Sequence, residues 1–277
     1  FLTEEDSWIA SITRRPDPDA GRYQRLMTLL ENVIEEHKSI DYLLMPEVSL
    51  PPVWFMRLAH KLSSRRISLI AGIEYIHARR KAVRNQVWSA LTHNGFGFPS
   101  HLVYMQDKQT PAFHEETELK RIGGVTMRPA VHWPGGNPPI IQHGGFFFSI
   151  LVCSELTNIS YRSAIRGKVD ALFVPEWNPD TDSFNALVES AALDVHAYIL
   201  QCNHRQYGDS RIRAPYKKSW MRDLVRIKGG ILDYFVVGEI DIKQLRRFQS
   251  PHRSPSGPFK PVPDGFSISF ERETLPL

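Results

Sequence analysis

Short apolar runs alternate with stretches of helical periodicity along most of this chain, and that alternation limits its fold more than any other feature. Apolar residues recur on one helical face over 21–38 and 53–66, whereas 41–47, 67–74 and 170–175 are continuous apolar runs typical of buried strands. A further helical pattern at 183–196 leads into an apolar run at 197–203. This order predicts an α/β protein in which helices cover the strands.

The remaining segments extend the same pattern. An Asn94-Gly95 turn separates two predicted strands, and Gly144-Gly145 separates two more, the second of which ends at Cys153. Further strands are predicted at 7–13, 222–229 and 231–241, short helices at 160–167 and 243–248, and a Gly- and Pro-rich loop at 122–139.

One domain is expected from these elements. A length of 277 residues suits a single large α/β layer domain, which we place at residues 1–249. A proline-rich tail over residues 250–277 is expected to lie across a surface or a partner subunit. Its prolines are Pro251, Pro255, Pro258, Pro261, Pro263 and Pro276.

Cysteine usage indicates the compartment. The two cysteines, Cys153 and Cys202, each end an apolar run, so we expect no disulfide framework and a reducing, cytoplasmic location. Cys202 is expected in the core. No stretch reaches the roughly 18 apolar residues of a membrane helix, and no membrane partner is expected. The first residue is Phe1, which suggests a trimmed chain or a segment of a longer polypeptide.

Positive charge gathers late in the sequence. Residues 205–228 hold eight Lys or Arg against Asp209 and Asp223, so this segment alone is +6 in a chain of net charge +4. One interpretation is a solvated edge. The other is an exposed docking surface, away from any catalytic residue, for nucleic acid, an acidic partner or an anionic substrate.

Three predicted strands end in complementary reactive groups. Glu47 follows "YLLMP", Lys108 follows "LVYMQD" and Cys153 follows "FFFSILV". Strands of such a sheet are buried, and reactive side chains are exposed where the chain leaves the sheet. An acid, an amine and a thiol together suffice for nucleophilic acyl chemistry.

The residue types suggest a role for each group. A cysteine thiol is mostly protonated at neutral pH and needs a base or a cation beside it, and Glu47 and Lys108 could supply these. Lys108 and the backbone N–H of Ser154 are candidates to stabilise negative charge on the substrate. His143, His196 and His204 do not form a Cys/His pattern with metal-ligand spacing, and no cofactor is implied.

Six segments in order resemble the nitrilase, or carbon–nitrogen hydrolase, superfamily over about residues 7–248. They are "LLMPEVSLP", "LIAGIEYI" with "NQVWSAL", "YMQDKQTPAFHEE", "ILVCSELTNISYRSAIRGKVDALFVP", "GDSRIRAP" and "VVGEIDIKQLRRF". The resemblance implies a four-layer α-β-β-α sandwich and a homodimer or larger assembly. It also implies hydrolysis, or acyl transfer, at the non-peptide C–N bond of a small amide or nitrile through a thioester.

The resemblance also implies site residues. Glu47, Lys108 and Cys153 match the family's triad, and the second glutamate is expected at Glu116, with Glu115 as the alternative. The acid two residues after the nucleophile, Glu155, matches either a site or a structural role.

The sequence departs from the family pattern after the strand at 170–175 and beside Lys108. Trp177 and Asn178 stand in the bulky, acidic segment "VPEWNPD", where pocket residues are expected. Asp107 lies next to Lys108 and could bind its ammonium group. Asp194 matches a structural glutamate of the family.

A second interpretation belongs to another class of protein. The chain could be a nitrilase-like module of a larger nucleic-acid-associated protein, such as a bacterial antiviral-defence reverse transcriptase, acting as effector or assembly scaffold. The basic segment 205–228 would then face nucleic acid or a nucleic-acid enzyme.

Overall fold

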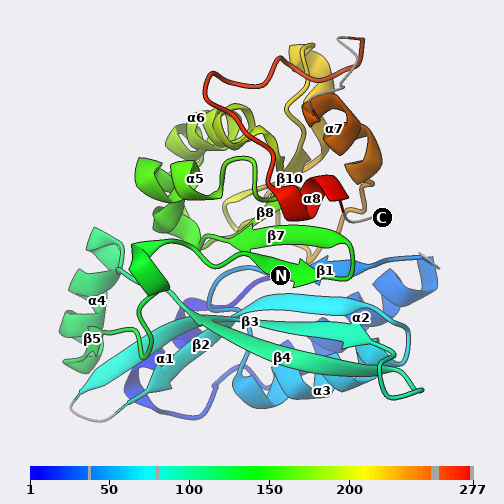
Figure 1. The fold of residues 1–277 in the computed structure, drawn as a ribbon. Coiled ribbons are helices and arrows are strands. Elements are labelled where there is room, and N and C mark those ends of the chain that lie inside the picture. The colour runs from blue at the N-terminus through cyan, green and yellow to red at the C-terminus, as the bar shows by residue number, and fades with distance from the viewer. Residues whose placement is uncertain (37–38, 79–80, 251–255, 275–277) are drawn as a thin grey trace.

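The computed structural model describes residues 1–36, 39–78, 81–250 and 256–274. Two β-sheets face one another, with α2 (Arg22–Glu36) and α3 (Pro52–Ser63) outside one sheet (Figure 1). Helices α5 (Ile159–Ile165) and α6 (Thr181–Ala191) lie outside the other. The predicted four-layer α-β-β-α sandwich is therefore confirmed. Among the described residues, no helix combines the length and apolar character needed to cross a membrane.

The first sheet comes from the N-terminal half of the chain. Its strand order is β1 (Tyr42–Leu44), β2 (Ser68–His77), β3 (Ala82–His93) and β4 (Ser100–Asp107), and the short β5 (Thr126–Met127) pairs with the beginning of β3. β1 runs parallel to β2, and the next two pairs are antiparallel. β1 is an edge strand of this sheet.

The second sheet has six strands. Their order is β11 (Asp223–Lys228), β10 (Gly208–Arg213), β9 (Tyr198–Cys202), β8 (Ala171–Pro175), β7 (Phe146–Ile150) and β6 (Ile141–His143). The central strands β7, β8 and β9 are parallel, which brings their carboxyl ends to one edge of the sheet. That edge carries the chemistry described below.

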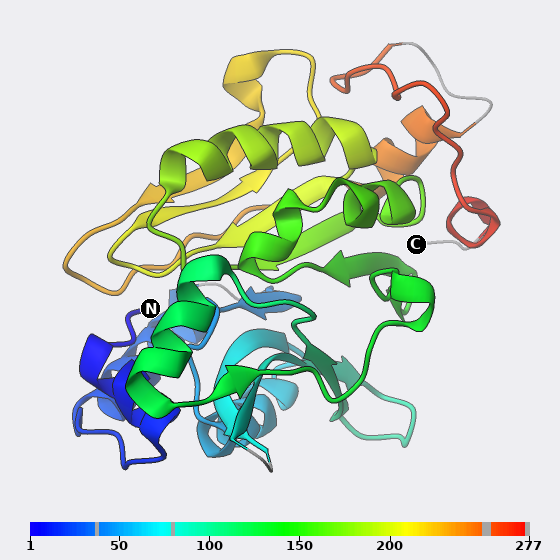
Figure 2. The ribbon, with the colours of Figure 1, turned by 90° about the vertical axis from the view of Figure 1, so that its left-hand side faces the viewer.

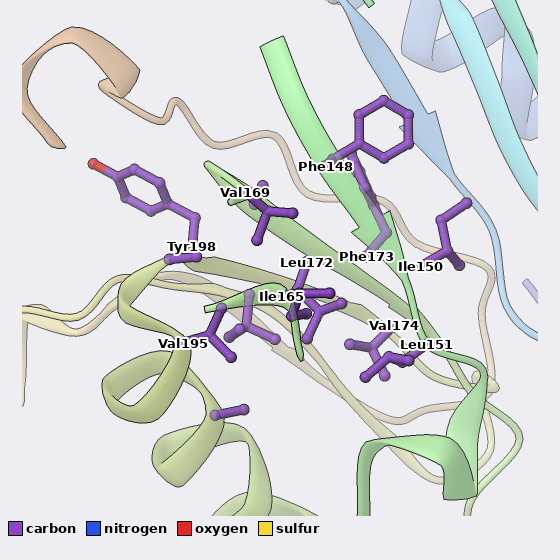
Figure 3. Packing of buried hydrophobic residues seen from close by; sticks show 14 of the residues in the cluster. Phe148, Ile150, Leu151, Ile165, Val169, Leu172, Phe173, Val174, Val195 and Tyr198 are labelled. Atoms are coloured by element: carbon purple, nitrogen blue, oxygen red, sulfur yellow. The ribbon is translucent and has the colours of Figure 1, made fainter. Parts of the chain in front are cut away.

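Both faces of the central strands are buried, which explains their continuous apolar sequences. Phe148 and Ile150 extend toward the first sheet, and Leu172 extends toward the helices near Ile165 (Figure 3). Phe173 lies against Tyr42 of β1, with ring centroids 5.8 Å apart, so the two sheets are packed together through aromatic side chains.

Three predicted elements differ in the structure. Residues 7–13 belong to the helix α1 (Glu5–Thr13), whose first turn contains Glu5 and Asp6, acids that favour a helix N-terminus. No strand is assigned to 231–241. The predicted loop at 122–139 begins with the end of an unpredicted helix, α4 (Phe113–Gly123), which lies against α1 (Figure 2).

The proline-rich tail contributes to the core as well as to the surface. After α7 (Ile242–Gln249) the chain returns so that Phe259 is fully buried. Helix α8 (Phe270–Thr274) then inserts Arg272 beside Asp170, at 2.8 Å. Pro251, Pro255 and Pro276 lie outside the described residues.

The basic segment does not form one exposed basic face, and that prediction is wrong for three of its five arginines. Arg211, Arg213 and Arg222 are buried. The five arginines pair with nearby acids: Arg205 with Asp233, Arg211 with Asp209 and Asp223, Arg213 with Asp223 and Glu189, Arg222 with Glu189, and Arg226 with Asp209 and Asp223. Lys217, Lys218, Arg226 and Lys228 are exposed. Much of the segment's positive charge is thus neutralised by ion pairs within the protein.

Candidate active site

Loops at three strand ends bring Glu47, Lys108 and Cys153 into one buried region. Lys108 directly follows β4, and its backbone N–H donates to the carbonyl of Asn85 on the neighbouring strand at 2.9 Å. Glu47 follows β1 and crosses β2 at Gly72, where an added Cβ would lie only 2.4 Å from the Glu47 Cα. Glycine is therefore required at that crossing.

The Lys108 ammonium is held between two carboxylates. Its Nζ lies 2.9 Å from Glu47 Oε1 and 2.7 Å from Glu115 Oε2, and the lysine is almost fully buried. Burial alone would lower the pKa of Lys108, but Glu115 and Glu47 together raise it well above its usual value. Lys108 is consequently a fixed positive charge and not a proton acceptor at neutral pH.

Polar side chains of the first sheet fix the two carboxylates. Asn85 Nδ2 donates to Glu47 Oε1 at 2.7 Å and to Glu115 Oε1 at 2.8 Å. Tyr75 donates its hydroxyl to Glu115 Oε1 at 2.9 Å. Although burial opposes ionisation of Glu115, the ion pair with Lys108 lowers its pKa. The cluster therefore holds two carboxylates against one ammonium in a buried site.

The second glutamate at this site is Glu115, and the prediction of Glu116 is corrected. Both residues lie in the first turn of α4, but about 100° apart around the helix. Glu116 points outward and pairs with Lys120 at 2.7 Å, with both side chains exposed. Glu115 shares its helix face with Leu119, the buried residue one turn later, and reaches Lys108.

Cys153 begins a tight turn at the mouth of β7. The residue is buried and has φ of +49°, a left-handed conformation that costs energy for a residue with a side chain. Burial, and then the charge of Glu47, raises the pKa of the Cys153 thiol well above its usual value, while Lys108 and the Trp177 backbone N–H act in the opposite direction. The resting thiol is protonated, and attack requires a base beside it.

The Glu155 carboxylate accepts hydrogen bonds from two backbone segments of the site. Its Oε1 accepts from the backbone N–H of Gln109 at 2.7 Å, and its Oε2 accepts from that of Val152 at 2.9 Å. These bonds tie the Lys108 segment to the Cys153 segment. Burial raises the pKa of Glu155 to about 7. Glu155 was expected to have either a site role or a structural role, and these two hydrogen bonds favour the structural role.

The segment after β8 contributes mainly through its backbone. The Trp177 N–H donates to Glu47 Oε2 at 3.2 Å and also faces the Cys153 thiol. The Trp177 ring stacks on His204, with centroids 4.6 Å apart. Asn178 instead shapes the turn, since its N–H donates to Asn203 Oδ1 at 2.9 Å and its Nδ2 donates to the carbonyl of Asp180.

Other predicted neighbours lie elsewhere. Asp107 does not bind the Lys108 ammonium, because its carboxylate accepts from Gln86 Nε2 at 2.9 Å and from the backbone N–H groups of Ala130 and Val131. Ser154 is half-buried in the turn after Cys153, where its backbone carbonyl accepts from Thr157.

The histidines and the second cysteine occupy separate places. His143 Nε2 lies 2.7 Å from the carbonyl of Thr92, and His196 Nε2 lies 2.8 Å from that of Lys260. Cys202 ends β9 half-buried, and burial raises its pKa to about 11. Within the described ranges, no three His, Cys, Asp or Glu side chains gather in a way that could hold a metal ion.

Comparison with solved structures places this geometry in a known fold. An amidase from Nesterenkonia sp. aligns with a TM-score of 0.57 and 17% identity, over 79% of this chain and 84% of that chain. A cysteine-to-alanine variant of the Nesterenkonia AN1 amidase, from the nitrilase superfamily, aligns with a TM-score of 0.56 and 16% identity, over 76% and 82%. The chain has the fold of these nitrilase-superfamily amidases.

A third similar structure is also an amidase. It is a glutamate-to-glutamine variant from Nesterenkonia sp. AN1 in which acrylamide has added to the active-site cysteine. It aligns with a TM-score of 0.54 and 16% identity, over 75% of this chain and 84% of that chain. No protein-family model matches the present sequence, and no curated protein matches it.

This nitrilase-type fold also buries residues that sequence reasoning missed. Asn85 and Tyr75 hold the carboxylates, and Glu176 lies fully buried immediately before Trp177. Burial raises the pKa of Glu176 to about 8; Gln201 donates to its Oε2 at 2.9 Å, and its Oε1 has no hydrogen-bond partner. The available signal was the polar pair Asn85-Gln86 within the strand predicted before the Asn94-Gly95 turn.

Proposed function

We propose that this protein is a thiol-dependent carbon–nitrogen hydrolase that acts on small amides, with Cys153 as nucleophile, Glu47 as general base and Lys108 as electrostatic stabiliser. The single observation that carries the proposal is the ion-paired cluster of Lys108 with Glu47 and Glu115 beside a buried cysteine. Its occurrence at strand ends in the fold of nitrilase-superfamily amidases supports the same chemistry here.

The acylation step follows from the positions of the charges. Glu47 takes the thiol proton as Cys153 Sγ forms a bond to the amide carbon. Negative charge then develops on the amide oxygen, where Lys108 and the backbone N–H of Ser154 stabilise it. The C–N bond breaks as the proton on Glu47 passes to the leaving nitrogen, which departs as ammonia or an amine and leaves a thioester.

The second half-reaction returns the free enzyme. Glu47 accepts a proton from water as the water oxygen attacks the thioester carbon. The C–S bond breaks, the thiolate takes the proton back from Glu47, and the carboxylic acid leaves. An acyl acceptor other than water would enter at this same step and make the protein an acyl transferase. In a nitrile substrate, the same thiol would attack the nitrile carbon.

Lys108 is suited to an electrostatic role because its charge is present before substrate arrives. Two carboxylates raise its pKa, and Asn85 and Tyr75 hold one of those carboxylates in place. Preorganised charge of this kind needs no rearrangement during reaction. Glu115 is therefore a positioning residue, which acts on substrate through Lys108.

The nucleic-acid interpretation has little structural support. The arginines of 205–228 are paired with acids, and three of them, Arg211, Arg213 and Arg222, are buried. Phosphate binding depends on cations that are free to neutralise phosphate. Assembly as a homo-oligomer stays a proposal and is tested below.

Matched cysteine variants test the proposed function. We expect Cys153→Ala to abolish release of ammonia from a panel of small aliphatic amides such as butyramide, with an unchanged circular dichroism spectrum. Cys202→Ala should retain turnover and lose only stability, because that thiol ends β9 and its charged neighbours are the N-terminus and Glu176. Equal loss of activity in two folded variants would mean that the nucleophile is misassigned.

A further inference from the structure

The peptide group between Glu176 and Trp177 contacts both the proposed base and the proposed nucleophile. Its carbonyl accepts from the backbone N–H of Glu47 at 3.4 Å, and its N–H donates to Glu47 Oε2 at 3.2 Å. The same N–H also faces the Cys153 thiol. The position of this one peptide group therefore affects how Glu47 is placed relative to Cys153.

The Glu176 side chain lies on the face of the second sheet that is turned away from the first sheet. Phe173 of β8 faces the first sheet, and side chains alternate between faces along a strand. The β-ladder extends to Glu176, whose N–H donates to the carbonyl of the last residue of β9 at 2.8 Å, so Glu176 shares its face with Val174. The register of the sheet places Gln201 beside Val174, and Arg211 beside Gln201.

Three side chains on this face form a buried polar chain. Glu176, Gln201 and Arg211 are 0%, 4% and 3% exposed. Gln201 Nε2 donates to Glu176 Oε2 at 2.9 Å, and Arg211 Nε donates to Gln201 Oε1 at 2.8 Å. At the two ends, Glu176 Oε1 and Arg211 Nη2 have no hydrogen-bond partner within the described chain. One amide side chain thus joins a buried acid to a buried guanidinium.

These surroundings favour the neutral form of Glu176. A buried carboxylate is costly unless a cation or several donors bind it, whereas Gln201 supplies one uncharged donor. Burial accordingly raises the pKa of Glu176 to about 8, against the opposing effects of Gln201 and Arg211. Glu176 is therefore mostly protonated at neutral pH.

Ionisation of Glu176 would disturb the site in two ways. Its negative charge would oppose formation of the Cys153 thiolate. The carboxylate would also be attracted toward Arg211, and movement of the side chain would shift the peptide group that follows it. The charged and titratable groups around Glu176 come from four segments: Glu47 after β1, Cys153 after β7, Cys202 of β9, and Asp209 and Arg211 of β10.

We propose that Glu176 is a positioning residue of the hydrolase, whose protonated side chain, held by Gln201, fixes the 176–177 peptide group against Glu47 and Cys153. The inference rests on the proposed function, because it assigns Glu176 a role in that same reaction. Glu176 acts through the peptide group and not on the substrate. Release of its proton to water at higher pH lowers turnover.

Two variants separate the hydrogen bond of Glu176 from its charge. Glu176→Gln keeps an acceptor for Gln201 and cannot ionise, whereas Glu176→Leu is apolar and has no acceptor. With butyramide as substrate, Glu176→Leu should lower kcat by about tenfold at pH 6, because the peptide group is no longer held. Glu176→Gln should restore kcat to the wild-type value at that pH. KM should change little in either variant.

The pH dependence of kcat tests the role of the proton. An acid with a pKa of about 8 is about ten times less protonated at pH 9 than at pH 6. The ratio of kcat in Glu176→Gln to kcat in the wild type should therefore rise about tenfold over this range. Other titrations, such as that of Glu155, affect both proteins and cancel in the ratio. The same ratio for Glu116→Gln, an exposed acid, should stay constant.

Circular dichroism at both pH values checks that the proteins compared are folded. A Glu176→Gln ratio that is constant with pH, or a Glu176→Gln kcat as low as that of Glu176→Leu, would overturn the proposal. If Glu176→Leu does not fold, the Glu176→Gln ratio decides alone. Failure of the proposed function is distinguishable, because turnover would then be absent from the wild type or would survive Cys153→Ala, and this inference would fail with it. Cys153-dependent turnover with a constant ratio would overturn only the role of Glu176.

Discussion

At the scale of single residues, the two adjacent glutamates of α4 offer the sharpest contrast. Glu115→Gln should lower kcat on small amides by about a hundredfold, because the Lys108 ammonium would lose one of its two carboxylates. Glu116→Gln is the matched control, since that side chain is exposed and pairs only with Lys120 in the structure. Steady-state kinetics on both variants, with melting temperatures as a check on folding, measures the difference. A larger loss of kcat in Glu116→Gln would favour Glu116 as the second glutamate.

Glu176 leads to a prediction about pH. Burial raises its pKa from 4.5 to about 8. The folded state therefore binds a proton that the unfolded state releases, and the resulting stability is full below about pH 4.5 and lost as the pH rises through about 8. Glu176→Gln copies the neutral acid and removes this dependence.

Denaturant unfolding of the wild type and Glu176→Gln at about pH 5 and about pH 9 tests the sign. The stability of the variant relative to the wild type should rise with pH. A constant difference between the two proteins would show that Glu176 titrates normally in the folded state.

The clustering of Glu47, Lys108 and Cys153 could be predicted from residues alone, because each follows an apolar strand and strand ends meet at one edge of a sheet. The second glutamate could not be predicted in the same way, because the choice between Glu115 and Glu116 depends on a helix that was not predicted. Once α4 is known, its period decides the matter: Glu115 lies one turn before buried Leu119.

At the scale of elements, the errors have physical causes. α4 buries only Leu119, so it lacks the apolar stripe that predicts a helix, and its signal is the charge order, with acids in the first turn and Lys120 and Arg121 in the last. Residues 7–13 predict a strand but form α1. The strand predicted at 231–241 has suitable side chains but no partner strand in the described chain, and propensity alone does not form a sheet.

The tail offers a prediction at this scale. Arg272 of α8 is almost fully buried and pairs with Asp170, which also binds Arg246. Arg272→Ala should reduce the free energy of unfolding by about 3 kcal/mol, since it removes one partner of a buried ion pair. Arg121→Ala, which breaks an exposed pair with Glu118, should leave the free energy of unfolding nearly unchanged, because water screens exposed charges. Chemical denaturation measures both, and similar losses would mean that the tail adds little to the fold.

At the scale of the whole molecule, the predicted homodimer directs attention to α5, the helix that follows the nucleophile turn. Ile159 at its start is 72% exposed, and an exposed apolar residue beside the site suits a subunit contact. If α5 pairs with its copy, the protein should have twice the mass of one chain by light scattering. Ile159→Arg should halve that mass, and the exposed Val53→Arg should not. A wild-type protein of monomer mass would contradict the expected assembly.

The central claim is that Cys153 carries an acyl group during turnover, and intact-mass spectrometry tests it most directly. Protein quenched in acid during turnover of butyramide and related small amides should gain the mass of the acyl group, and peptide mapping should locate it on Cys153. Cys153→Ala should gain nothing under the same conditions. Consumption of amide with no covalent adduct, an adduct on Cys202, or no adduct from any amide of the panel would contradict the mechanism.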